Sequence, residues 1–169
     1  MKKIIMAKEI IYLLNQNDLP RLTSISGNID IDYIKPYVKM AQDSNLKTIL
    51  GEQLYKKIEN DFESDSLAGD YLTIYDEYIV DMLVYYSAYY LISFHNYKIS
   101  NNGILKASPE NQETIDNLDI EKIASKYLQL GASVELRFNQ EKHKYNIPEL
   151  QSKNCGDANS GSYQMNWFL

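Results

Sequence analysis

Apolar side chains recur every three or four residues over most of the chain, which is the spacing of one face of an α-helix. The longest such run, residues 71–97, is apolar over most of its circumference and predicts a central helix about 40 Å long. A heptad-like seam along it predicts a face that packs in the core or against another copy of the chain. The tyrosines on this seam are Tyr71, Tyr75, Tyr78, Tyr85 and Tyr89.

Two shorter amphipathic segments come before this run, on either side of the polar stretch 41–45. Asp30 or Asp32 can cap the first helix, and a start near Asp32 is preferred because it places Pro36 close to the first turn. The polar stretch is predicted to break the helix and fold the second segment back on the first. Gly51 would then let another part of the chain pack closely against the turn. The predicted packing joint consists of Ala41, Leu50, Gly51, Leu54 and Tyr55.

The N-terminal part of the chain carries a shorter apolar pattern. Residues 4–15 are predicted to form a short helix, or an extended arm followed by a helix. Asn17, Asp18 and Pro20 are predicted to stop this element, because such residues favour turns.

The C-terminal part contains a predicted loop, a last helix and a tail. Residues 101–117 are polar and contain Gly103 and Pro109, which indicates a loop. A helix is predicted from Asp119 to about Tyr145, before Pro148. Its apolar stripe consists of Ile120, Ile123, Ala124, Tyr127, Leu128, Leu130, Val134 and Phe138.

Residues 151–169 are rich in Gly, Ser and Asn and then carry several large apolar side chains, which predicts a flexible tether with an aromatic anchor. The anchor can dock on its own domain or on another chain, and it consists of Tyr163, Trp167, Phe168 and Leu169. We therefore expect one all-α domain over residues 1–150, a small helical bundle around one long central helix, followed by an extended C-terminal tail.

Composition narrows the function classes. Fifteen of the 169 residues are tyrosine, which suits half-buried subunit contacts but can equally reflect an AT-rich genome. The net charge is -6 and no run of Lys or Arg exceeds two residues, which argues against sequence-specific DNA binding. A surface that lets DNA pass without sticking stays compatible with this charge.

Targeting and redox signals are weak. Lys8 and Glu9 interrupt the apolar run near the start of the sequence, and residues 79–92 contain Asp81 and are shorter than the roughly 20 residues of a membrane span. We expect a chain that is not exported, does not cross a membrane and is soluble in the cytoplasm when made. Cys155 is the one cysteine, so no internal disulfide can form and a reduced thiol is expected.

Motifs for catalysis or metal binding are not found. His95 and His143 have no partner at ligand spacing, and neither a P-loop nor an HExxH pattern occurs. Residues 61–72 begin with alternating carboxylates like a calcium loop, but the sixth and twelfth positions are Ser66 and Leu72 rather than Gly and Glu. We expect no metal and no cofactor.

Glu77 and Asp81 form a like-charge pair four residues apart on the predicted central helix. The pair can mark the wet edge of the helix, or it can be a buried carboxylate pair in which one pKa is raised. The first interpretation is preferred, and we expect no enzymatic activity.

The order of elements in residues 30–58 resembles the head-to-tail connector (adaptor) proteins of tailed bacteriophages. In this layout a helix leads through Ala-Gln and a polar break to Leu-Gly-x-x-Leu-Tyr and a second helix. The later long helix, loop, terminal helix and tail follow a similar order. The positions that carry the resemblance are Ile34, Val38, Ala41, Gln42, Leu46, Leu50, Gly51, Leu54 and Tyr55.

The resemblance implies a non-enzymatic ring, commonly of twelve copies, in the virion neck between capsid and tail. Such a ring docks on the portal protein, contacts other neck or tail proteins, extends the DNA channel and assembles in the host cytoplasm. The C-terminal segment of that family commonly reaches a neighbour or the portal, a role implied here for the aromatic anchor. Pro36 and the stretch 101–117 depart from the family pattern.

Two other function classes stay open. One is a small helical regulatory module that binds a single protein partner through the face on residues 71–97 and has no catalytic activity. The other, third in order, is an enzyme that uses Glu77 and Asp81.

Overall fold

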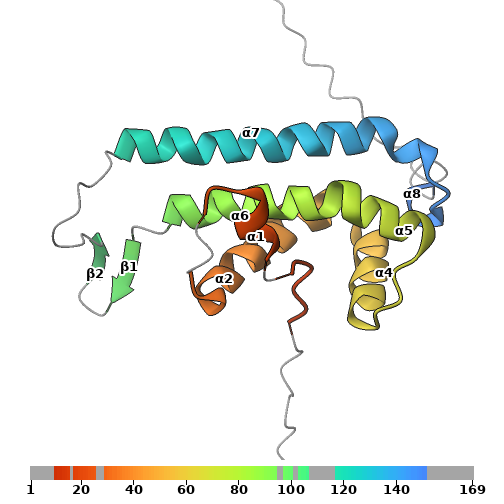
Figure 1. The fold of residues 1–169 in the computed structure, drawn as a ribbon, viewed down its shortest axis with the longest axis horizontal. Helices are drawn as coiled ribbons and strands as arrows, with labels where there is room; N and C mark the ends of the chain where they lie inside the picture. The colour runs from red at the N-terminus through yellow and green to blue at the C-terminus, as the bar shows by residue number, and fades with distance from the viewer. Residues whose placement is uncertain are drawn as a thin grey trace, which may run out of the picture.

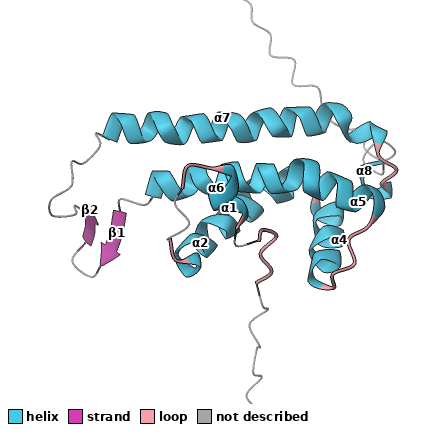
Figure 2. Cartoon of the chain, viewed as in Figure 1, coloured by secondary structure: helices cyan, strands magenta, loops and turns pink. Residues whose placement is uncertain are grey.

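Helices make up most of the chain that the computed structural model describes, so the fold is all-α, as predicted (Figure 2). None of the helices in this part is long and apolar enough to cross a membrane. The structure describes residues 10–15, 17–25, 29–94, 97–100, 103–106 and 117–151.

The helices follow one another with short connections. They are α1 (Asp18–Leu22), α2 (Ile31–Ala41), α3 (Lys47–Leu50), α4 (Glu52–Glu63), α5 (Gly69–Ile74), α6 (Val80–Phe94), α7 (Asn117–Glu141) and α8 (Pro148–Gln151). Two π-helical turns occupy Gln42–Leu46 and Tyr75–Ile79, and a 3-10 turn occupies Lys142–Lys144. Strands β1 (Tyr97–Ser100) and β2 (Gly103–Lys106) form an antiparallel hairpin.

The long α6 lies in the middle of the molecule (Figure 1). α7 runs antiparallel along one side of α6, and α1 and α2 pack on the other side. The main core joins α6 to α4 through Leu54, Tyr55 and Ile58, and to α7 through Phe138. A smaller cluster joins α1, α2 and the end of α6 through Leu19, Ile34, Val38 and Leu91.

The predicted long helix is confirmed as the central element. α5, the π-helical turn Tyr75–Ile79 and α6 follow one another without a break over residues 69–94. The helix ends at Phe94, however, and Tyr97 begins β1 instead of closing the helix.

The predicted break at residues 41–45 is wrong. The π-helical turn Gln42–Leu46 keeps the chain helical from α2 into α3, with Gln42 and Leu46 buried. Asp43 on the outer side bonds the amino groups of Lys39 and Lys47, each four residues away, which stabilises the helical path. The chain turns instead at Gly51, whose φ of 80° and ψ of 158° are accessible almost only to glycine. Gly51 is thus the joint itself.

The N-terminal prediction is partly wrong. Residues 10–15 contain no helix and α1 follows them, which fits the extended arm of the two predicted arrangements. Asp18 and Pro20 do not stop a helix but lie within α1. Pro20 is tolerated there because backbone N–H groups of a first turn have no intrahelical acceptor. Residues 4–9 lie outside the described residues.

The predicted cap of α2 is confirmed at Asp30, whose carboxylate accepts a hydrogen bond from the backbone N–H of Asp32 at 3.0 Å. The helix begins at Ile31, so Pro36 lies beyond the first turn and the helix continues through it.

The predicted loop at residues 101–117 is also partly wrong. β2 lies within this range and pairs with β1, with Ile99 opposite Ile104. Two Asn residues separate the strands in the sequence, a spacing and composition that favour a hairpin. α7 begins two residues before the predicted Asp119, and its 3-10 continuation ends one residue before the predicted Tyr145. The predicted tail beyond residue 151 lies outside the described residues.

Candidate functional site

Gln42 fastens the N-terminal arm to the rest of the fold. The side-chain carbonyl of this fully buried residue accepts from the backbone N–H of Leu13 at 2.9 Å. Its amide donates to the backbone carbonyl of Ile11 at 3.0 Å and to the Tyr55 hydroxyl at 2.9 Å. The amide thus bonds the arm as a neighbouring strand would. The sequence signal was a polar residue on the apolar line Val38, Gln42, Leu46, but we assigned it no role beforehand.

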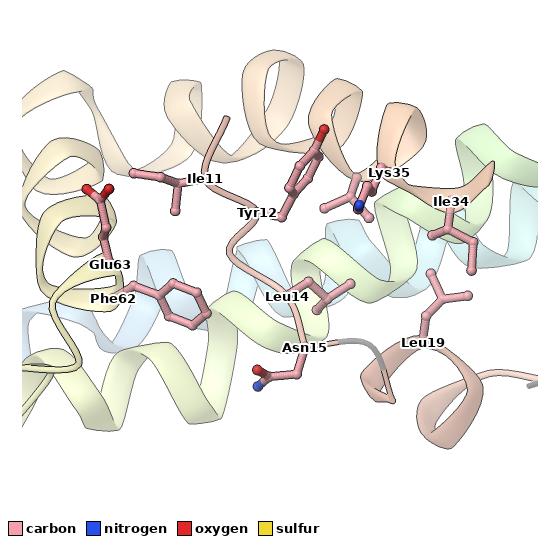
Figure 3. Close-up of a pocket in the computed structure, with 10 residues that line it drawn as sticks. Ile11, Tyr12, Leu14, Asn15, Leu19, Ile34, Lys35, Phe62 and Glu63 are labelled. Carbon is pink, nitrogen blue, oxygen red and sulfur yellow. The ribbon is translucent and has the colours of Figure 1, made fainter. Parts of the chain in front are cut away.

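A pocket of about 380 Å³ lies beside this arm, between α1, α2 and the end of α4 (Figure 3). Ile11 and Leu14 of the arm, Leu19 of α1, Ile34 of α2 and Phe62 of α4 give it a mostly apolar lining. Lys35 and Glu63 also line it, and the Lys35 amine already pairs with the Asp32 carboxylate at 2.6 Å. Such a lining suits an apolar side chain better than a reacting group.

Tyrosine hydroxyls connect the central helix to the C-terminal helices. The hydroxyls of Tyr71, Tyr78 and Tyr86 each donate to a carboxylate at 2.7 Å. The acceptors are Glu149 of α8, Glu141 of α7 and Glu135 of α7. The abundance of tyrosine therefore has a use inside the chain, because each ring packs in or against the core while its hydroxyl reaches a carboxylate at the edge.

These contacts change the proton affinity of the groups involved. Burial, with a smaller effect of the Glu149 carboxylate, raises the pKa of Tyr71 to about 12. Burial likewise raises the pKa of Tyr78 and of Tyr86. The Tyr78 hydroxyl, followed by Lys144, holds the pKa of Glu141 below its ordinary value. The neutral phenol and the ionised carboxylate are thus the forms that the fold favours.

Glu77 and Asp81 lie at the edge between α6 and α7. Glu77 is exposed and accepts from the Tyr145 hydroxyl at 3.0 Å. Arg137 donates to the backbone carbonyl of Glu77 at 2.9 Å, and its guanidinium lies 4.0 Å from the Asp81 carboxylate. Burial raises the pKa of Asp81, and the nearby Arg137 opposes this shift. The two carboxylates have separate partners, so they do not form a shared buried pair.

The outer helix α7 leaves several apolar side chains in solvent. Its buried side includes Ala124, Val134 and Phe138, with Gly131 against the ring of Tyr86. A Cβ at Gly131 would lie 2.8 Å from the Tyr86 Cε1, so only glycine lets the two helices approach this closely. Part of the predicted stripe lies outside this contact. The exposed apolar residues of α7 are Leu118, Ile123, Leu128, Leu130 and Leu136.

The structure brings the predicted joint residues together. Ala41, Leu50, Leu54 and Tyr55 are buried in one cluster around the turn at Gly51. This cluster also contains two tyrosines of the predicted seam, Tyr75 and Tyr78. Tyr71 and Tyr85 pack against its edge, and Tyr89 is half-buried with its ring 5.1 Å from that of Tyr90. The predicted anchor residues Tyr163, Trp167, Phe168 and Leu169 lie outside the described residues.

Within the described ranges, no group of three or more His, Cys, Asp or Glu side chains is placed to hold a metal ion. His143 is exposed in the 3-10 turn Lys142–Lys144. His95 and Cys155 lie outside the ranges that are described.

The comparison with known proteins finds one family. The signature of a family of unknown function, DUF6712, matches residues 46–140, from the π-helical turn before α3 to the last turn of α7. No curated protein and no solved structure matches the chain. Since the matched region covers more than half of the 169 residues, the chain belongs to the DUF6712 family.

Proposed function

We propose that this protein is a head-to-tail connector of a tailed bacteriophage, a structural and non-enzymatic neck ring that docks on the portal and extends the DNA channel. The residues that carry the resemblance to connectors support this, because they form one structural unit at the joint from α2 to α4. All of them except Gly51 are buried. They are Ile34, Val38, Ala41, Gln42, Leu46, Leu50, Gly51, Leu54 and Tyr55.

The observation that carries the proposal is the exposed apolar surface of α7. This helix packs mainly along α6, and it leaves Ile123, Leu128 and Leu130 in solvent. Exposed apolar residues along one outer helix are typical of a surface that another chain covers. Assembly into a ring would cover this surface without requiring any catalytic group.

The acidic balance of the chain fits a channel that DNA passes through. With a net charge of -6, a ring of many copies repels phosphate and does not bind DNA by sequence. The proposed location is the virion neck, after assembly in the host cytoplasm with the portal and other neck or tail proteins. A structure of the assembled ring with a basic lumen would contradict the channel part of the proposal.

The proposal is tested by native mass spectrometry of the full chain, alone and with a portal protein encoded in the same genome. A ring of fixed high stoichiometry, expected near twelve copies, supports the connector. A persistent one-to-one complex supports the regulatory module instead, and a chain that neither assembles nor binds the portal overturns the connector. Deletion of residues 155–169 in the same assay asks whether the predicted anchor, which includes Trp167, holds the assembly.

A further inference from the structure

The surface of α7 is organised in lines of residues seven positions apart, which lie almost above one another on a helix. The line of Ala124, Gly131 and Phe138 is buried, and its middle residue touches the Tyr86 ring of α6. This line therefore faces the central helix. The residues on its two sides form the flanks of the α6–α7 pair.

One side is the acidic flank, which we define as Glu121, Leu128 and Glu135 of α7 with Phe94 of α6. Glu135 accepts the hydroxyl of Tyr86, which places this line beside the face of α6 that carries Tyr86 and, eight residues on, Phe94. Leu128 is 38% exposed and Phe94 is 46% exposed. Glu121 makes no ion pair with any residue in the described ranges. This flank thus offers apolar surface framed by negative charge.

The other side is the basic flank, which we define as Ile123, Lys126, Leu130 and Arg137. Arg137 reaches the Glu77 carbonyl and the Asp81 carboxylate, five residues before Tyr86 and so on a different face of α6. Ile123 is 37% exposed and Leu130 is 46% exposed. Lys126 is exposed and makes no ion pair within the part of the chain that is described. This flank offers apolar surface framed by positive charge.

The two flanks are complementary, but they face opposite sides of α7 and cannot meet within one subunit. Two copies related by a two-fold axis would bring each flank against itself and oppose like charges. A head-to-tail arrangement instead brings Leu128 with its carboxylates against Leu130 with its cations. Repeated around an axis, such a contact generates a ring or a filament.

We propose that the acidic flank of one copy docks on the basic flank of the next copy, so that α7 provides both halves of the subunit interface. The occupant of each flank is thus a second copy of this chain. This inference deepens the proposed function, since it rests on that function for ring closure. The contact between two copies can be measured without the portal.

Two variants of the full chain test the contact by blocking one flank each. Leu128→Asp places a charge on the acidic flank, and Leu130→Asp does so on the basic flank. Both positions are exposed in the subunit, so the fold should persist, and circular dichroism checks this. Leu136→Asp is the matched control, because Leu136 is 60% exposed and lies on the side of α7 turned away from both flanks.

Analytical ultracentrifugation of the separate and mixed variants gives the answer. Each blocked variant alone is expected to lose the higher assembly, with association weakened by about 30-fold or more, while the control assembles as wild type does. An equimolar mixture of the two is expected to form a heterodimer that grows no further, because one intact flank of each kind remains. Glu121→Lys and Lys126→Glu should each weaken assembly, and the chain carrying both should regain it.

The outcomes separate this inference from the proposed function. Folded Leu128→Asp and Leu130→Asp variants that still form wild-type rings overturn the flank contact but leave the connector standing. A mixture that stays monomeric, or a wild-type chain that is monomeric at all concentrations, also overturns the flank contact. Binding to the portal in the earlier assay then decides the connector independently.

Discussion

Replacement of Gln42 by leucine is the change that most directly tests how the N-terminal arm is held. Leucine keeps the size of the side chain but removes the acceptor of the Leu13 N–H and the donor to the Ile11 carbonyl and the Tyr55 hydroxyl. A buried polar group left without a partner costs about 1–3 kcal/mol. Tyr55 keeps a second contact, since its hydroxyl also lies 3.3 Å from a Glu59 carboxylate oxygen.

The Leu13 N–H is therefore the main loss, because Leu13 is fully buried while Ile11 is only half-buried and can regain water. We expect Gln42→Leu to lower the free energy of unfolding by about 2–4 kcal/mol, after part of the loss is offset by the more apolar side chain. This is a large share of the roughly 5–15 kcal/mol that stabilises a domain. Urea unfolding followed by circular dichroism measures the change in stability.

Amide hydrogen exchange shows where the loss occurs. The Leu13 amide should exchange faster in Gln42→Leu, whereas it should stay protected in Tyr55→Phe, the matched control that removes only the hydroxyl. Tyr55→Phe should cost about 1 kcal/mol. If Gln42→Leu is within about 0.5 kcal/mol of wild type and the Leu13 amide exchanges at the wild-type rate, Gln42 does not anchor the arm.

Four further changes have calculable consequences for stability, each measured by urea unfolding. Gly51→Ala should cost about 1–3 kcal/mol, because alanine is strained at a φ of 80° and ψ of 158°; an unchanged midpoint would contradict the assigned joint. Gly131→Ala should be destabilising by about 1–2 kcal/mol, since its Cβ would meet the buried Tyr86 ring at 2.8 Å and better helix propensity offsets only part of the clash. Ser87→Ala should stabilise by about 1 kcal/mol, because the buried Ser87 hydroxyl has no hydrogen-bond partner. The pKa of Tyr71 is raised from 10.0 to about 12 in the folded state, so its contribution is complete below pH 10 and is lost as the pH rises towards 12; a pH series should show a smaller alkaline decline in Tyr71→Phe.

The sequence by itself determined the helices whose pattern is long and local. The run over residues 69–94, the cap at Asp30 and the last helix with its buried Ala124 and Phe138 were predictable, because helical periodicity and capping depend on neighbours within one or two turns. The joint residues were also found, since Gly51 interrupts an apolar stripe that is otherwise continuous.

Interactions between distant segments decided what the local pattern could not. The stretch at 41–45 looked like a break, but the buried Gln42 bonds an arm some thirty residues earlier and keeps the helix intact. The arm itself carries helical periodicity, yet residues 10–15 are extended where they meet this amide. No local signal distinguishes a polar residue that faces water from one that meets a distant backbone.

The same limit applies to the candidate surfaces. Periodicity placed tyrosines on the central helix and leucines on α7, but it did not reveal that Tyr71, Tyr78 and Tyr86 reach carboxylates of the C-terminal helices. It also did not separate Phe138, which is buried, from Leu130, which is exposed. Both lie within the apolar stripe of one helix, and only the position of α6 beside α7 decides which part of that stripe is covered, because burial depends on the width of the neighbour and not on the helix alone.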